Sequence, residues 1–148
     1  MSEFTTSSVF PDVNVWLALS TPDHQFFPAA WNWYSALPDR TALVFCRNTQ
    51  LSFLRLLTTQ AVMGMGTLTQ AEAWKAYDRW LDDAAVEFAE EPAGLEPAFR
   101  SLTCSQQASP KEWADSYLTA FSITAGIRLV TFDRALAGKA KGSILLEP

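Results

Sequence analysis

The chain has 148 residues, of which 49% are hydrophobic and 18% charged, so it can bury a core and is too apolar to be intrinsically disordered. Its formal net charge of −5 disfavours non-specific nucleic-acid binding through clustered cations. The charge is uneven, because residues 72–96 carry eight acids and two bases, whereas residues 128–148 carry four bases and two acids. A nucleic-acid substrate that meets a local basic surface is therefore compatible with the composition.

The sequence shows no pattern of membrane insertion or export. No run reaches the roughly 18 apolar residues that a membrane span requires, and the polar residues 1–7 lack the basic and then apolar pattern of a signal peptide. Cys46 and Cys104 lie in apolar surroundings without a metal-binding or redox spacing, so we expect buried free thiols in a reducing compartment. We predict a cytoplasmic protein with no membrane partner, in one domain over residues 1–148 that begins with a polar tail.

Short apolar runs alternate with helical patterns along the chain. Five runs are rich in β-branched or apolar residues and predict strands: residues 8–11, 41–46, 86–88, 127–132 and 143–146. Seven segments have apolar residues at helical spacing and predict helices: residues 13–19, 23–37, 49–58, 69–83, 95–102, 110–125 and 134–140. This alternation predicts an α/β domain with a parallel sheet of about five strands, sandwiched by about seven helices.

Local signals indicate where several of these elements begin or end. Pro28 falls within the second predicted helix, either in its first turn or at a kink. Residues 69–72 (Thr-Gln-Ala-Glu) have the spacing of a capping box, in which the Thr and Glu side chains bond reciprocally to backbone N–H groups. Residues 109–112 repeat this pattern, with proline at the first helical position. Residues 63–66 alternate Met and Gly and predict a loop.

Three carboxylates are expected at one edge of the sheet. Asp12 directly follows the first predicted strand and Asp133 the fourth, and ligands bind outside the carboxyl ends of strands in open parallel sheets. Asp115 lies early in the helix that leads into the fourth strand, near the same edge. Each aspartate alone has a structural explanation, either as a helix cap or as an acid that favours the helix dipole. Their expected convergence favours a functional site.

A cluster of carboxylates points to a bound cation. Three neighbouring carboxylates repel and raise each other's pKa unless a cation neutralises them. An oxygen-only ligand set without His or Cys suits Mg²⁺ or Mn²⁺ better than Zn²⁺. A hard ion with open coordination positions orients a phosphate and activates a water, which is the chemistry of phosphodiester hydrolysis.

Four short blocks of the sequence resemble, in order, those of PIN domains. They are FPDVNVWLAL at residues 10–19, NTQLSFLRLLT at 48–58, ADSYL at 114–118 and LVTFD at 129–133. Their order and spacing are similar to those of the VapC-type toxin ribonucleases of bacterial toxin–antitoxin modules. The resemblance extends from Val9 to Leu146.

This resemblance implies a function and a set of site residues. It implies a Mg²⁺-dependent endoribonuclease, with one or two ions, that leaves a 5′-phosphate and a 3′-hydroxyl, forms a homodimer and is silenced by a VapB-type antitoxin. Mn²⁺ would substitute for Mg²⁺. Asp12, Asp115 and Asp133 would be the catalytic, metal-binding acids. Asn14 would support Asp12 or the water shell of the metal, and Thr131 would be a polar neighbour of Asp133.

Position 50 departs from the family pattern. Many family members carry Glu where this chain has Gln50, and an amide offers an oxygen but no charge. We predict that Gln50 is a site residue that tunes metal affinity. The alternative is a catalytically weakened PIN-like domain that acts as an RNA- or antitoxin-binding module.

Other residues admit a second interpretation as well. The cations that flank the acidic blocks, namely Arg47, Arg55, Lys111 and Arg134, are candidates for contacts with RNA phosphates, although ordinary solvation of helix faces also explains each of them. A third hypothesis is a phosphatase of the haloacid dehalogenase type with Asp12 as nucleophile. Its Asp-x-Asp-x-Thr motif is poorly matched, since Asn14 and Trp16 occupy the later positions.

Overall fold

The computed structural model describes residues 7–148, so the predicted polar tail lies outside the described residues except for Ser7. Five strands form one sheet in the order β3-β2-β1-β4-β5, and every neighbouring pair is parallel. The strands are β1 (Val9–Pro11), β2 (Leu43–Phe45), β3 (Val86–Phe88), β4 (Arg128–Thr131) and β5 (Ile144–Leu145). The predicted five-stranded parallel sheet is thus confirmed, and each strand lies within its predicted run.

Eight α-helices and one 3₁₀ turn accompany these strands in residues 7–148. They are α1 (Val13–Ser20), α2 (Phe27–Ser35), α3 (Arg47–Leu57), α4 (Gln60–Met63), η1 (Gly64–Gly66), α5 (Gln70–Leu81), α6 (Leu95–Leu102), α7 (Trp113–Ala125) and α8 (Arg134–Lys139). The prediction of about seven helices missed α4, a single turn too short to show apolar periodicity. The predicted loop at residues 63–66 is instead the end of α4 and the turn η1.

Two predicted helix starts were wrong. The second helix begins at Phe27 rather than at residue 23, so Pro28 lies in its first turn and causes no kink. The second capping box does not form, because α7 begins at Trp113 and Ser109 adopts a left-handed backbone with φ 44°. The Glu112 carboxylate accepts a hydrogen bond from Lys139 Nζ at 3.2 Å, a contact that the local sequence pattern does not contain.

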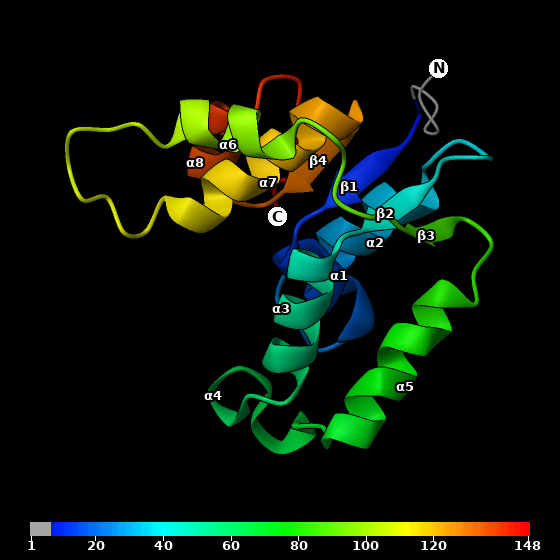
Figure 1. Ribbon diagram of the computed structural model, residues 1–148. Helices are drawn as coiled ribbons and strands as arrows, with labels where there is room; N and C mark the ends of the chain where they lie inside the picture. The colour runs from blue at the N-terminus through cyan, green and yellow to red at the C-terminus, as the bar shows by residue number, and fades with distance from the viewer. Residues whose placement is uncertain (1–6) are drawn as a thin grey trace.

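Helices cover both faces of the sheet, as the alternation of buried strand residues requires (Figure 1). Val9 and Val130 face one apolar cluster, which contains buried residues of α1, α2, α3 and α5. Phe10 and Leu129 face the other cluster, formed with α6, α7 and α8. The predicted sandwich of helices around a parallel sheet is therefore confirmed.

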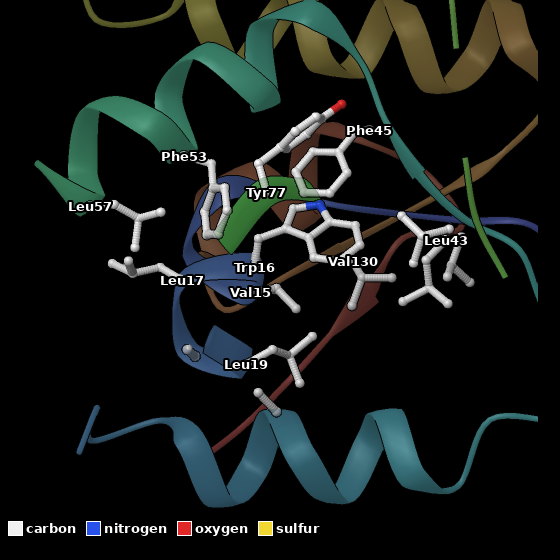
Figure 2. Packing of buried hydrophobic residues seen from close by; sticks show 14 of the residues in the cluster. Val15, Trp16, Leu17, Leu19, Leu43, Phe45, Phe53, Leu57, Tyr77 and Val130 are labelled. Carbon is white, nitrogen blue, oxygen red and sulfur yellow. The ribbon is translucent and has the colours of Figure 1, made fainter. Parts of the chain in front are cut away.

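Trp16 lies at the centre of the first cluster (Figure 2). Its ring is fully buried and stacks on Phe45, with ring centroids 3.9 Å apart, and Phe45 also meets the edge of Tyr77 from α5. These contacts hold α1 and α5 against the end of β2. Cys46, the next residue after β2, is buried as predicted, whereas Cys104 is exposed, so the prediction for Cys104 was wrong.

The capping box at the start of α5 forms as predicted. The Glu72 N–H donates to Thr69 Oγ1 at 3.1 Å, and the Thr69 N–H donates to the Glu72 carboxylate at 2.9 Å. We expect Thr69→Ala to lower the free energy of unfolding by about 1 kcal/mol, because two backbone donors at the helix start lose a partner or its alignment. Urea denaturation of Thr69→Ala beside Thr69→Ser measures this, and equal stability of the two variants would contradict it.

Candidate active site

Asp12 is a buried carboxylate held by three hydrogen bonds at the carboxyl end of β1. It caps α1, with its Oδ1 accepting from the backbone N–H groups of Asn14 at 3.0 Å and Val15 at 3.2 Å. Its Oδ2 accepts from the Thr131 hydroxyl. Burial raises the pKa of Asp12 to about 6, and the charge of Asp133 adds to that rise, while the three hydrogen bonds oppose it. A nearby cation would stabilise the charged form of such a buried carboxylate more than that of an exposed one.

Thr131 joins Asp12 to Asp133 at the ends of two neighbouring strands. Its fully buried hydroxyl donates to Asp12 and accepts from the Asp133 backbone N–H at 2.9 Å. Asp133 caps α8, with Oδ1 accepting from the N–H groups of Ala135 at 2.8 Å and Leu136 at 3.3 Å. The predicted neighbourhood of Asp12, Thr131 and Asp133 therefore forms, because β1 and β4 pair in parallel.

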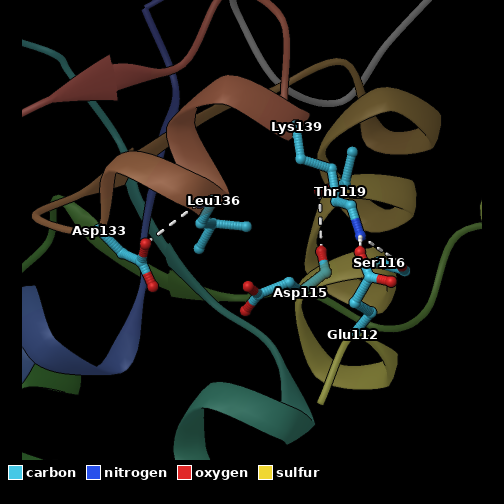
Figure 3. Close-up of polar contacts among 7 residues, drawn as sticks. All are labelled: Glu112, Asp115, Ser116, Thr119, Asp133, Leu136 and Lys139. Atoms are coloured by element: carbon cyan, nitrogen blue, oxygen red, sulfur yellow. Dashed lines mark hydrogen bonds and ion pairs between the residues drawn. The ribbon is translucent and has the colours of Figure 1, made fainter. Parts of the chain in front are cut away.

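Asp115 faces Asp133 from the first turn of α7 (Figure 3). Partial burial raises the pKa of its carboxyl, the Asp133 charge raises it further, and the Lys139 ammonium opposes these effects. Lys139 Nζ donates to the buried Ser116 Oγ at 2.9 Å and pairs with Glu112 at 3.2 Å. No sequence pattern singled out Lys139, although it lies in the basic C-terminal stretch, residues 128–148.

The oxygen ligands of the three aspartates suit a hard cation, but the three carboxylates do not form a complete coordination site. Within residues 7–148, no three His, Cys, Asp or Glu side chains converge closely enough to make a complete metal site. In this same part of the chain, neither Asp133 Oδ2 nor the Asp115 carboxylate accepts a hydrogen bond, so these oxygens are free to bind a cation.

Gln50 is buried one turn into α3, and its amide oxygen is already engaged. Arg47 Nη1 donates to Gln50 Oε1 at 2.5 Å, and the Gln50 amide also hydrogen-bonds the Tyr77 hydroxyl. The contacts found for Gln50 thus run to α5 and to Arg47, and among the described residues none joins it to the three aspartates. Its predicted role in metal binding receives no support from this geometry.

The remaining predicted site residues are all exposed but differ in their contacts. Asn14 is exposed and supports Asp12 through its backbone N–H. Arg134 is exposed and pairs with Glu147 at 2.8 Å. Lys111 is exposed in the turn before α7, two residues before the exposed Trp113. Within residues 7–148, neither Lys111 nor Arg134 makes a hydrogen bond or ion pair to the three aspartates.

Residues 9–142 match the family described as the PIN domain. The chain belongs to the PIN-domain family. This PIN domain is 43% identical over 128 residues to a protein named Ribonuclease VapC41 from Mycobacterium tuberculosis, and the match covers 84% of this chain and 88% of that protein. The resemblance to VapC-type proteins predicted from the four sequence blocks is thereby confirmed.

Solved structures share the architecture of this PIN domain. VapC20 of Mycobacterium tuberculosis, described as a sarcin–ricin loop cleaving toxin, superposes with a TM-score of 0.66 at 17% identity, over 95% of this chain and 99% of that chain. VapBC2 of Rickettsia felis, solved with a DNA fragment from its promoter, gives a TM-score of 0.64 at 10% identity over the same shares. At these identities the likeness concerns the fold alone.

A membrane-spanning helix is not found in this PIN domain over residues 7–148, since no helix there combines the length and the apolar character that a bilayer requires.

Proposed function

We propose that this PIN-domain chain is a divalent-metal-dependent endoribonuclease, the toxin of a type II toxin–antitoxin module, with Mg²⁺ as its ion and Mn²⁺ as a substitute. The observation that carries the proposal is the buried Asp12 carboxylate. The Thr131 hydroxyl hydrogen-bonds both this carboxylate and the backbone N–H of Asp133, which bears the second carboxylate. Asp12 and Asp133 also cap α1 and α8, but helix capping does not explain the Asp115 carboxylate, which faces Asp133 and accepts no hydrogen bond within residues 7–148. The name of the VapC41 relative supports RNA as the substrate.

The ion would be held by Asp12, Asp115 and Asp133. When bound, such an ion supplies Lewis-acid stabilisation of the phosphodiester and lowers the pKa of the attacking water. Asp12 contributes a carboxylate whose orientation is fixed by three hydrogen bonds, so little reorganisation is needed on binding. The Lys139 ammonium favours the charged form of Asp115 and so opposes the rise in the pKa of Asp115 that burial and Asp133 cause.

We propose two partners in the cytoplasm: a VapB-type antitoxin, which the name of the VapBC2 neighbour indicates, and a second copy of this chain. An apolar groove between α3 and α5, with a volume of about 420 Å³, supports a protein partner. Its rim includes Leu51 and Trp74, which are 63% and 47% exposed and too apolar for a surface that meets only water. Light scattering on the purified chain, alone and with its antitoxin, tests both partners.

The experiment that tests the function is an RNA cleavage assay on protein purified free of antitoxin. We expect single-stranded RNA to be cut with Mg²⁺ or Mn²⁺ and to stay intact with EDTA. Cleavage that persists in EDTA would refute the metal mechanism. RNA binding without turnover would instead support the weakened binding module, and a trapped aspartyl-phosphate would support the phosphatase.

The raised pKa of Asp12 predicts a pH dependence of metal binding. Above about pH 6 Asp12 is charged and free to bind the ion, and below that value a proton competes with the ion. We expect the affinity for Mn²⁺ to be nearly constant above about pH 7 and to fall by about tenfold per unit below pH 6. Isothermal titration calorimetry with Mn²⁺ measures this in the absence of RNA. An affinity that stays constant down to about pH 4.5 would show that Asp12 has an ordinary pKa.

A further inference from the structure

Arg47 is an exposed cation whose orientation is fixed but whose charge is not neutralised. Its guanidinium lies over the Phe88 ring, 4.8 Å from the centroid, and Nη1 donates to Gln50 Oε1. Three other cations of residues 7–148, Arg100, Arg134 and Lys139, pair with a carboxylate within 4.0 Å, and in this part of the chain Arg47 does not. A guanidinium has five N–H donors in a rigid fork, so several remain free here.

Gln50 holds this arginine from inside the protein. Its amide group is buried, with the oxygen on Arg47 and the other end hydrogen-bonded to the Tyr77 hydroxyl. Figure 2 shows that this hydroxyl points out of the apolar cluster around Trp16. The chain Tyr77–Gln50–Arg47 therefore links a packed core residue to the surface. A neutral amide in the middle of that chain fixes the guanidinium and leaves its full charge available.

The register of the sheet places Arg47 beside the acidic site rather than in it. In the β1–β2 pair Val9 lies opposite Leu43, so Asp12 and Cys46 follow their strands at the same level. Arg47 comes next, and its guanidinium turns toward Phe88 at the end of β3. The strand β3 is two places from β1, a separation of about 10 Å. A phosphate bound by Arg47 is therefore not the one at the aspartates.

We propose that Arg47 binds a phosphate that flanks the cleaved bond of a single-stranded RNA, and that Gln50 is the positioning residue of Arg47 rather than a weakened metal ligand. The proposal rests on the proposed ribonuclease function and adds a substrate contact to it. It also explains why an amide suits position 50: a carboxylate there would pair with Arg47 and cancel the charge that the RNA needs.

The test measures RNA binding by the full chain in EDTA, where cleavage is absent. Fluorescence anisotropy of a short labelled single-stranded RNA over a range of salt concentrations gives the dissociation constant and its salt slope. We expect Arg47→Ala and Gln50→Glu each to weaken binding by roughly three- to tenfold and to reduce the slope by about 0.7, the loss of one phosphate contact. Arg47→Lys keeps the charge, so its slope should stay near that of the wild type. In Mg²⁺, Arg47→Ala should raise KM far more than it lowers kcat, since a flanking contact is made equally in the ground and transition states.

Arg79→Ala provides the matched control. Arg79 is likewise exposed, and its replacement by alanine removes the same charge as Arg47→Ala. Arg79 lines a cavity with Ser20, which lies at the far end of α1 from Asp12. If the wild type cleaves RNA while Gln50→Glu binds it as tightly as the wild type, or if Arg47→Ala matches Arg79→Ala, the inference is overturned and the ribonuclease function stands. If Gln50→Glu instead tightens Mn²⁺ binding without loss of RNA affinity, position 50 is a metal ligand. A wild type that neither binds nor cuts RNA refutes the proposed function itself.

Discussion

Asp12→Asn is expected to lower metal-dependent RNA cleavage by roughly two to three orders of magnitude, because it removes the most buried ligand of the proposed ion. Asparagine keeps an oxygen that can accept from the N–H groups that Asp12 caps, so the fold should persist. Cleavage of single-stranded RNA in Mg²⁺ and in Mn²⁺ measures the effect. Asp83→Asn is the matched control, since Asp83 also accepts a backbone N–H two residues ahead, at 2.9 Å, far from the site at the start of β3.

The same substitution should stabilise the metal-free protein at neutral pH. The pKa of Asp12 rises from 3.8 to about 6 on folding, so its ionisation opposes folding above pH 6, and this cost vanishes below about pH 4. We expect the free energy of unfolding of metal-free Asp12→Asn to exceed that of the wild type by about 3 kcal/mol at neutral pH, with the difference closing as the pH falls. Thermal melts across this range measure it. If Asp12→Asn cleaved RNA at the wild-type rate, or if the stability difference did not depend on pH, the role assigned to this carboxylate would be contradicted.

The parts of the site that sequence predicts are those fixed by strand ends. Asp12 and Asp133 follow β1 and β4, and a parallel pair of strands necessarily brings such residues to one edge. The resemblance to PIN domains implied Thr131 as a polar neighbour of Asp133, and it is the last residue of β4, two residues before Asp133. The short α4 and the left-handed backbone at Ser109 lie outside this logic, because α4 is a single turn without a periodic pattern and Ser109 is a non-glycine residue with positive φ.

The parts that sequence does not predict depend on long-range side-chain contacts. Lys139 reaches Glu112 and Ser116 from a different helix and places an ammonium beside Asp115. Gln50 occupies the position of an expected metal ligand, yet its hydrogen bond to Tyr77 comes from an element that is 27 residues further along the chain. The contacts of Lys139 depend on packing between α7 and α8, and the contact of Gln50 with Tyr77 depends on packing between α3 and α5, so no local spacing encodes them.

Thr131→Val tests whether the two strand ends act as one unit. Valine has nearly the same shape but removes the hydroxyl that donates to Asp12 and accepts from the Asp133 N–H. That hydrogen bond holds the pKa of Asp12 down, so its loss should move the pKa above 6 and shift the pH midpoints of Mn²⁺ binding and RNA cleavage upward. We expect roughly tenfold slower cleavage at neutral pH, recovering toward alkaline pH.

The stability of Thr131→Val should fall in a pH-dependent way. Loss of the acceptor for the Asp133 N–H costs about 1–3 kcal/mol at all pH values, and a further cost appears above pH 6, where Asp12 is charged without its Thr131 donor. Thr131→Ser keeps the hydroxyl and should retain the wild-type pH profile, which separates loss of the hydrogen bonds from loss of packing. An unshifted profile in Thr131→Val would mean that Asp12 is poised by burial alone, and the hydroxyl would then serve only to pair the N–H of Asp133.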